Sequence, residues 1–235
     1  MPSVDIVIPV YNEERTLDGS VERLANFLQD SVALPWRIVI ADNASTDGTL
    51  ELARSLAEKY PQVATIHLDE KGRGRALRRA WLESPADIVC YMDVDLSTDL
   101  SALPPLLAAI LEGYPVAIGS RLLPDSQVRR SVKREVISRI YNLLVRLLFF
   151  FSLSDAQCGF KALSRQTVRE LVPLVKNQEW FFDSELLILA LRKGYRVKEV
   201  PVTWVEDADS RVDILKTAWE DIRGLLRMRF TPLSK

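Results

Sequence analysis

Two aspartates, Asp93 and Asp95, stand one residue apart at the end of the apolar run "DIVCYM" at residues 87–92. Carboxylates this close repel each other unless a cation or hydrogen-bond donors compensate them. A hard divalent ion that also binds substrate phosphates would supply that compensation. The alternative is structural, with one acid capping the helix expected near Ser101 and the other facing water. The position of the pair at the end of an apolar run favours a metal site.

A second acidic segment, "IADNASTDGT", follows another apolar run. Asp47 and Gly48 are typical of a turn that caps a helix. Asp42 comes directly after the run, where a carboxylate could accept hydrogen bonds from a base or a ribose. Asp42 is therefore a candidate for nucleotide recognition.

The segment "EKGRGR" at 70–75 surrounds two glycines with the cations Lys71, Arg73 and Arg75. Backbone amides and positive charge could together hold an anion such as a diphosphate. The segment matches neither GxxxxGK[ST] nor GxGxxG, and a solvated turn is equally compatible with it. His67, the single histidine, lies in a predicted strand and is expected to be structural, so no histidine-based triad is predicted.

A basic stretch covers residues 121–146, with seven Lys or Arg and only two acids. Such an excess in a nearly neutral chain indicates an anionic partner. It runs into the apolar segment "IYNLLVRLLFFF" at 140–151. A basic segment leading into an apolar helix is typical of an element that lies on a lipid surface. A core helix with a solvated basic flank is the alternative.

The elements that position these residues form an α/β pattern. Strands are predicted at 4–10, 37–41, 63–68, 87–92 and 116–119, and helices at 16–30, 47–59, 73–84 and 101–112, the last with Ser101 as N-cap. This alternation predicts a mostly parallel sheet flanked by helices, with ligands beyond the carboxyl ends of the strands. The remaining chain predicts a helix at 132–151, a loop at 155–161, a helix near 182–193, an alternating strand at 195–205 and a final helix within 210–229.

Composition limits the function classes. The 235 residues are 48% hydrophobic with a formal net charge of -1, which suits one globular domain and argues against nucleic-acid binding through bulk charge. Two cysteines make neither a disulfide framework nor a zinc-ligand set, so a reducing, cytoplasmic setting is expected. No signal peptide is evident and no apolar run is long enough to span a bilayer.

The order of motifs resembles family 2 glycosyltransferases with a GT-A (Rossmann-like) fold, specifically the dolichyl- or polyprenyl-phosphate hexosyltransferases. The motifs that carry the resemblance are "IVIPVYNEE", "ADNASTDGT", "DVDLS", "GSR" (119–121), "DAQCGFK" (155–161), "WFFDSELL" (180–187), "EVPVTW" (199–204) and "DSRV" (209–212). One departure is "DNAS" at 42–45, where many lipid-phosphate mannosyltransferases have "DDGS".

The resemblance implies inverting transfer of a hexose from a nucleotide-sugar to a lipid phosphate, with UDP-glucose the preferred donor and GDP-mannose next. Mg²⁺ or Mn²⁺ would be bound by Asp95 and Asp93, and the catalytic set would be Asp93, Asp95 and Asp183. The donor would be bound by Pro9, Tyr11, Glu13, Asp42 and Asp93, with Lys71 from the glycine segment beside them.

For the acceptor phosphate, the resemblance assigns Arg121, Arg134, Ser138 and Arg211, the last beside Ser210. A phosphate monoester is already largely ionised near neutral pH and needs no strong base. Asp183 and Glu185 match an acidic motif, for which orientation of acceptor or sugar is the preferred role. Two alternatives remain: a glycan hydroxyl acceptor with Asp183 as base, and a non-catalytic module that binds nucleotide-sugar or lipid.

The expected organisation is a single domain, 1–235, with a nucleotide-sugar half at 1–120 and an acceptor and membrane-facing half at 121–235 that contains amphipathic, interfacial helices. The expected partners are the nucleotide-sugar, a polyprenyl or dolichyl phosphate and a membrane surface, and the chain could form a homo-oligomer. The protein would attach peripherally to the inner, cytoplasmic face of the membrane.

Overall fold

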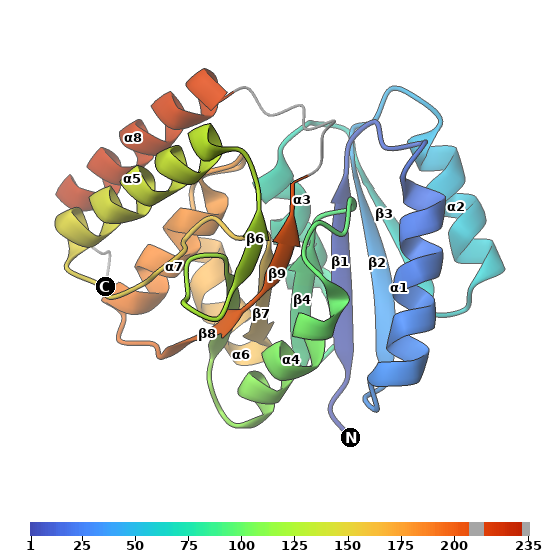
Figure 1. Ribbon diagram of the computed structural model, residues 1–235. Helices are drawn as coiled ribbons and strands as arrows, with labels where there is room; N and C mark the ends of the chain where they lie inside the picture. The colour runs from blue at the N-terminus through green and yellow to red at the C-terminus, as the bar shows by residue number, and fades with distance from the viewer. Residues whose placement is uncertain (207–213, 232–235) are drawn as a thin grey trace.

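A computed structural model describes residues 1–206 and 214–231, except for the side chains of 214–216. Its main sheet has seven strands in the order β3-β2-β1-β4-β7-β5-β8 (Figure 1). The strands are β1 (Val4–Val10), β2 (Trp36–Asn43), β3 (Val63–Leu68), β4 (Ile88–Met92), β5 (Val116–Ser120), β7 (Phe160–Ser164) and β8 (Val197–Pro201). All neighbours pair in parallel except β7, which is antiparallel to β4 and β5. The predicted mostly parallel sheet is confirmed.

Helices cover both faces of this sheet because side chains alternate along each strand. Ile6 and Ile8 of β1 belong to one apolar core, which includes buried residues of α1 (Leu17–Ser31), α2 (Thr49–Lys59) and α4 (Leu103–Leu111). Val7 points into the other core, formed with α3 (Arg73–Glu83), α6 (Arg165–Leu171), α7 (Phe182–Arg192), α5 (Val132–Phe149) and α8 (Ile214–Phe230). Helices α5 and α8 lie side by side at one end of the molecule (Figure 1).

Two short 3₁₀ helices, η1 (Leu100–Ala102) and η2 (Val172–Leu174), complete the helical elements of the described chain. Helix α5 ends at Phe149 rather than at 151, because Phe150 adopts a left-handed conformation with φ 61°. A left-handed residue of this kind commonly terminates a helix.

Two of the sequence-based element predictions were wrong. The strand expected over 195–205 is divided into β8 and β9 (Thr203–Val205), and β9 leaves the main sheet to pair with β6 (Gln127–Arg129). Pro201, at the break, has no N–H to continue the ladder, whereas the alternating pattern runs through it. The loop expected over 155–161 ends in β7, so Lys161 lies inside a strand.

The order of the strands reverses between β1 and β4. The first half of the chain winds outward from β1 to β3, and β4 then begins on the other side of β1. Ligands in such sheets bind beyond the carboxyl ends of the strands at this point. Asn12, Ala44 and Leu96, in the loops that follow β1, β2 and β4, have φ between 50 and 60°. Such strained residues cluster where the surrounding structure holds a functional loop in place.

Candidate active site

The aspartate pair follows β4, and its two members have different surroundings. Asp93 is half-buried, and its Oδ1 accepts a hydrogen bond of 2.6 Å from Arg73 Nη2. Asp95 is exposed, and its Oδ1 accepts from the backbone N–H of Ser97 at 2.9 Å. Arg73 therefore compensates the charge of Asp93, and the Asp95 carboxylate lies at the surface.

Neither aspartate caps the following helix, so the capping alternative is wrong. Asp99 does so instead, because its Oδ1 accepts the backbone N–H of Ser101 at 2.9 Å ahead of η1. The prediction of Ser101 as N-cap is also wrong. Asp47 does serve as a turn and cap residue, since its Oδ1 accepts from the backbone N–H of Thr49 at 3.0 Å at the start of α2.

Arg73 is the centre of a buried ion network. It joins Asp93 to Asp183, whose Oδ2 lies 2.7 Å from Arg73 Nη1. Lys161 is fully buried, with its Nζ 3.1 Å from Asp183 Oδ1, and the Tyr91 hydroxyl donates to the same oxygen. The network thus connects the carboxylate beside β4 to the N-terminal turn of α7.

The charges in this network fix one another's protonation states. Burial alone would lower the pKa of Arg73, but Asp93 and Asp183 hold that pKa well above its usual value. Burial alone would raise the pKa of Asp183, but Lys161 and Arg73 lower it. A buried carboxylate with two cationic partners and a lowered pKa is a poor proton acceptor. This environment argues against Asp183 as a general base.

The two glycines of "EKGRGR" allow close packing. A Cβ at Gly72 would lie 2.7 Å from the carbonyl oxygen of Gln178, and one at Gly74 would lie 2.6 Å from Cβ of Phe182. The backbone N–H of Gly72 also donates to Asn43 Oδ1 at 2.6 Å. The segment is therefore a packed junction between α3 and the start of α7, and the solvated-turn alternative is wrong.

The candidate nucleotide site lies where β1 and β2 end side by side. Pro9 pairs in register with Ala41, and Val10 pairs with Asp42, which brings Tyr11 and Asp42 to one edge of the sheet. Lys71 Nζ lies 3.4 Å from the centroid of the Tyr11 ring. Glu13 begins the next loop, where its backbone N–H donates to Thr49 Oγ1 at 2.8 Å.

Asp42 is fully buried at this edge. His67 Nδ1 lies 2.6 Å from Asp42 Oδ2, so the single histidine holds the carboxylate of a predicted site residue. Asp42 Oδ1 has no hydrogen-bond partner among the described residues. An unsatisfied buried acceptor is costly, so this oxygen suits an N–H or O–H donor supplied by a ligand.

The first predicted acceptor residue, Arg121, is held by Asp155. Its Nε lies 2.7 Å from Asp155 Oδ2 and its Nη2 lies 3.0 Å from Oδ1. Burial alone would raise the pKa of Asp155, but the paired Arg121 lowers it to about 2. The Arg121 guanidinium also lies 5.6 Å from the centroid of the Trp204 ring. This cation is therefore fixed in place by a buried carboxylate.

The other predicted acceptor residues lie on α5, apart from Arg211, which with Ser210 is outside the described residues. Arg134 Nε is 2.9 Å from Glu206 Oε1. Ser138, one helical turn further, is buried, and its Oγ has no hydrogen-bond partner in the described part of the chain. Arg134 and Ser138 are thus placed near each other along one helix, as predicted.

Strand β9 connects the loop that follows β4, named here the aspartate loop, to helix α5 through β6. On one side, the Val205 N–H donates to the Ser97 carbonyl at 3.0 Å and the Asp99 N–H donates to the Thr203 carbonyl at 2.9 Å. On the other side, β9 pairs with β6, which leads directly into α5. Residues distant in the sequence therefore meet around one short strand.

Several residues of this arrangement were missed by sequence reasoning. They are Asp155 and Lys161, which hold Arg121 and Asp183, Gly159, which packs against Asp93, and Glu206, which pairs with Arg134. The motif "DAQCGFK" contains three of the four, and its acid, glycine and lysine within one expected loop were the available signal.

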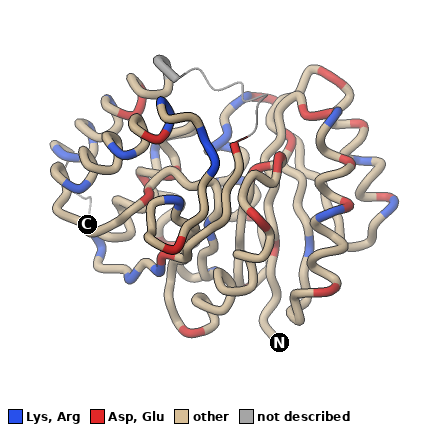
Figure 2. Tube along the Cα trace, in the orientation of Figure 1, with Lys and Arg blue, Asp and Glu red and all other residues tan. Residues whose placement is uncertain are grey.

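Helices α5 and α8 each expose a row of apolar side chains, and these residues are named here the α5–α8 surface. It comprises Val132, Val136, Ile140, Leu143, Leu144, Leu147 and Phe150 from α5 and its end, and Trp219, Ile222, Leu226 and Phe230 from α8. Lys and Arg recur along the same two helices (Figure 2). Within the residues described, none of the helices combines the length and apolarity needed to cross a bilayer.

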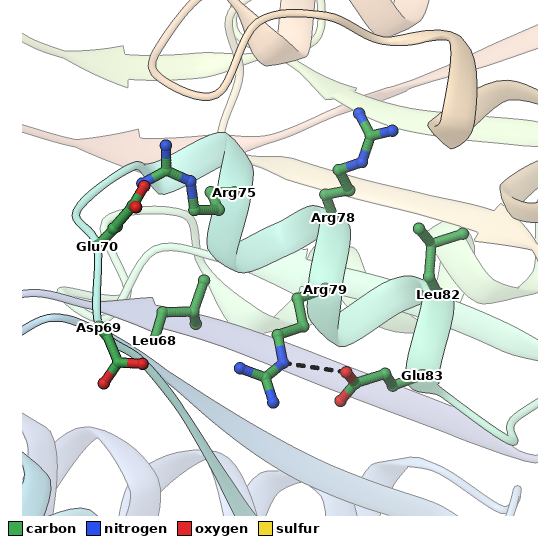
Figure 3. Close-up of a pocket in the computed structure, with 8 residues that line it drawn as sticks. All are labelled: Leu68, Asp69, Glu70, Arg75, Arg78, Arg79, Leu82 and Glu83. Atoms are coloured by element: carbon green, nitrogen blue, oxygen red, sulfur yellow. Dashed lines mark hydrogen bonds and ion pairs between the residues drawn. The ribbon is translucent and has the colours of Figure 1, made fainter.

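A pocket of about 470 Å³ lies elsewhere, between the end of β3 and the outer side of α3 (Figure 3). Two of its three arginines have acidic partners: Arg79 Nε is 3.0 Å from Glu83, and Arg75 Nη1 is 2.8 Å from Glu70. The third, Arg78, donates to the backbone carbonyls of Val175 and Pro173.

A doubly wound, mostly parallel sheet of this kind occurs in GT-A glycosyltransferases, and here the D-x-D segment at 93–95 lies at its switch point. Residues 5–172 match the Glycosyl transferase family 2, so this chain belongs to that family. The fold is similar to that of glucosyl-3-phosphoglycerate synthase from Mycobacterium tuberculosis, solved in complex with Mn²⁺, uridine-diphosphate and glucosyl-3-phosphoglycerate. That likeness has a TM-score of 0.72 at 20% identity and covers 97% of this chain and 80% of the other.

Curated relatives have more specific names. Glycosyltransferase AglD of Haloferax volcanii is 40% identical over 94% of this chain and 35% of its own length. Dolichol-phosphate mannosyltransferase of Pyrococcus furiosus is 32% identical over 96% of this chain and 63% of its own. Dolichyl-phosphate beta-glucosyltransferase of Saccharomyces cerevisiae is 28% identical, with coverages of 97% and 75%. The chain therefore spans about a third of AglD and larger fractions of the other two.

Proposed function

We propose that this chain transfers a hexose from a nucleotide-sugar to dolichyl or another polyprenyl phosphate, with Mg²⁺ or Mn²⁺. The observation that carries the proposal is the connection, through β9, of the Asp95 loop to the helix that carries Arg134. This connection supports a donor site and an anion site around one strand. The names of the relatives from Pyrococcus furiosus and Saccharomyces cerevisiae support the same acceptor class.

The donor would bind along the ends of β1, β2 and β4, within the proposed half at 1–120. The unsatisfied Asp42 Oδ1 would accept a hydrogen bond from the base, with Pro9, Tyr11 and Glu13 around the nucleoside. Lys71 would neutralise part of the diphosphate. UDP-glucose is the donor we favour over GDP-mannose, in keeping with the several relatives named as glucosyltransferases.

Asp95, with Asp93, would hold the metal ion. No group of three or more acidic, histidine or cysteine side chains suited to a metal occurs in the described part of the chain. This fits Mg²⁺ or Mn²⁺, which often bind one or two carboxylates and complete their shell with water and substrate phosphates. When bound, the ion would neutralise charge on the departing nucleoside diphosphate.

The acceptor phosphate would meet Arg121, Arg134 and Ser138, with Arg211 a further proposed contact. Its oxygen is largely ionised near neutral pH and can act without a protein base. The lowered pKa of Asp183 fits this acceptor better than a glycan hydroxyl. Asp183 would act by fixing Arg73, and through it Asp93, in position.

The α5–α8 surface would lie on the cytoplasmic face of a membrane, where its apolar side chains enter the headgroup region and its cations meet anionic lipids. We expect Leu147→Glu to weaken cosedimentation with phosphatidylglycerol vesicles, because Leu147 is exposed on α5. Leu111→Glu is the matched control, since Leu111 is also exposed, at 52% against 62% for Leu147, but lies on α4. Equal binding by both variants would contradict this placement.

The transfer itself is tested by incubating the chain with UDP-glucose or GDP-mannose, a divalent ion and a short-chain polyprenyl phosphate. A lipid-linked sugar that requires metal is the expected product. Arg134→Ala should abolish transfer, whereas Arg139→Ala, which removes an exposed cation of the same helix, should not. Failure with every donor would overturn the proposal, and transfer to a glycan hydroxyl would favour the alternative acceptor.

A further inference from the structure

We infer that Glu206 is an internal ligand of the acceptor-phosphate site and makes that site selective for a phosphate monoester. The inference rests on the proposed function and goes beyond it, because it assigns a specificity-determining role to a residue outside the predicted site. It begins from two contacts of one carboxylate. Glu206 Oε2 accepts from the backbone N–H of Ser131 at 2.6 Å, and Oε1 lies 2.9 Å from Arg134 Nε.

These two donors are the kind that a phosphate uses. Ser131 is the N-cap of α5, where backbone N–H groups and the helix dipole favour an anion. Arg134 adds a guanidinium, which forms charge-assisted hydrogen bonds with phosphate oxygens. The Glu206 carboxylate therefore occupies a place suited to an incoming phosphate, and the two anions compete for Arg134 Nε.

Replacement of Glu206 at Arg134 by the acceptor favours a phosphate monoester over an uncharged acceptor. Glu206 carries one negative charge, whereas a monoester carries about 1.5 to 2 at neutral pH. A phosphate also has three oxygens for hydrogen bonds, and the buried Ser138 hydroxyl, one turn along α5, has no partner among the described residues. A hydroxyl acceptor has no charge with which to displace the carboxylate, so Arg134 stays paired with Glu206.

The backbone of Glu206 is fixed, so its side chain returns when phosphate leaves. Its N–H donates to the Arg129 carbonyl at 2.9 Å, directly after β9. The neighbouring Val205 is hydrogen-bonded to Ser97 of the aspartate loop. Glu206 thus keeps Arg134 ordered while the acceptor is absent. Only an acceptor with enough negative charge can displace Glu206 from Arg134.

The test compares Glu206→Gln with the unchanged chain and with Glu135→Gln. Glu135 is the matched control because it lies in the first turn of α5 and, like Glu206, pairs with arginine, but with Arg130 and Arg139. Binding of inorganic phosphate and of a short-chain polyprenyl phosphate is measured by calorimetry without donor. We expect Glu206→Gln to bind both at least about ten-fold more tightly, Glu135→Gln to bind them unchanged, and Arg134→Ala/Glu206→Gln to lose the gain.

Steady-state rates supply an independent readout. Glu206→Gln should lower KM for the acceptor and leave KM for the nucleotide-sugar unchanged, which a general loss of structure would not do. If that variant does not fold, Glu206→Asp, whose shorter side chain cannot reach both donors, should show the same direction of change. Unchanged or weaker phosphate binding by a folded variant would overturn the inference. Tighter phosphate binding without transfer by any form of the chain would instead overturn the proposed function.

Discussion

Replacing Gly159 by alanine would move the Asp93 side chain without changing the carboxylate itself. An ideal Cβ at position 159 would lie 1.9 Å from Asp93 Oδ2 and 2.8 Å from its Cγ. Ordinary van der Waals contact requires at least 3.4 Å, so Gly159→Ala must increase the separation from Oδ2 by about 1.5 Å, the difference between 3.4 and 1.9 Å. The Asp93 side chain is partly exposed and can swing away from the new methyl group.

That movement would disturb the contact on which the orientation of Asp93 depends. Its Oδ1 lies 2.6 Å from Arg73 Nη2, and a shift of this size breaks or reorients the hydrogen bond. A misplacement of about 1 Å in an active site can cost about 100-fold in rate. We therefore expect kcat/KM for the nucleotide-sugar to fall about 100-fold, with a loss of unfolding free energy of about 1–3 kcal/mol from overpacking.

Initial rates of sugar transfer at varied donor concentration, together with thermal unfolding, measure both effects. Gly19→Ala is the control, because Gly19 lies in α1 with no atom within 4 Å of an added Cβ. That change should leave transfer unaltered and raise the unfolding free energy by about 0.5–1 kcal/mol, since alanine favours helix. Full activity of Gly159→Ala would refute the assignment of Asp93 to the donor and metal site.

Three further predictions concern stability. Asp183→Asn removes the carboxylate that the buried Arg73 and Lys161 share, and should reduce the unfolding free energy in urea by about 3–5 kcal/mol; an unchanged midpoint would contradict the network. Burial raises the pKa of Asp221 to about 7 from 3.8, so the folded protein binds this proton more tightly than the unfolded chain does. The resulting stabilisation, up to about 4 kcal/mol of unfolding free energy, is fully present below about pH 4 and is lost as the pH rises to about 7. Asp221→Asn should remove that pH dependence in melting curves between pH 4 and 8, and equal slopes for both proteins would disprove it. Ala44 has φ 60°, a left-handed conformation that is strained for alanine and not for glycine. Ala44→Gly should therefore raise the unfolding free energy by less than about 1 kcal/mol and the melting temperature slightly. A lower melting temperature would show that no strain is relieved.

The first half of the fold was predictable because its signals are local. Each parallel strand from β1 to β5 is a short apolar run bounded by polar residues, and the helices between them have continuous periodicity. The positions of Asp42, Asp93 and Asp95 followed from one rule, that parallel strands bring their carboxyl ends to the same edge. No pairing between distant segments had to be known.

The parts that were missed depend on distant partners. Lys161 is charged and fully buried inside β7, a combination that an apolar pattern excludes, and its counter-ion Asp183 belongs to α7. Arg73 looks like part of an anion-binding turn when read locally. Its carboxylate partners lie 20 and 110 residues away, and they make it an internal structural cation.

Arg121 and Arg134 differ in how easily a substrate phosphate can displace their carboxylate partners. Arg121 is paired with Asp155, which is fully buried, so displacing that carboxylate would leave an uncompensated charge in the interior. Arg134 is paired with Glu206, and both side chains keep partial access to solvent, at 29% and 21%. Water can therefore receive the displaced Glu206 carboxylate at small cost. Arg121 is thus suited to supply a fixed positive charge, and Arg134 is suited to exchange its carboxylate partner for the proposed acceptor phosphate.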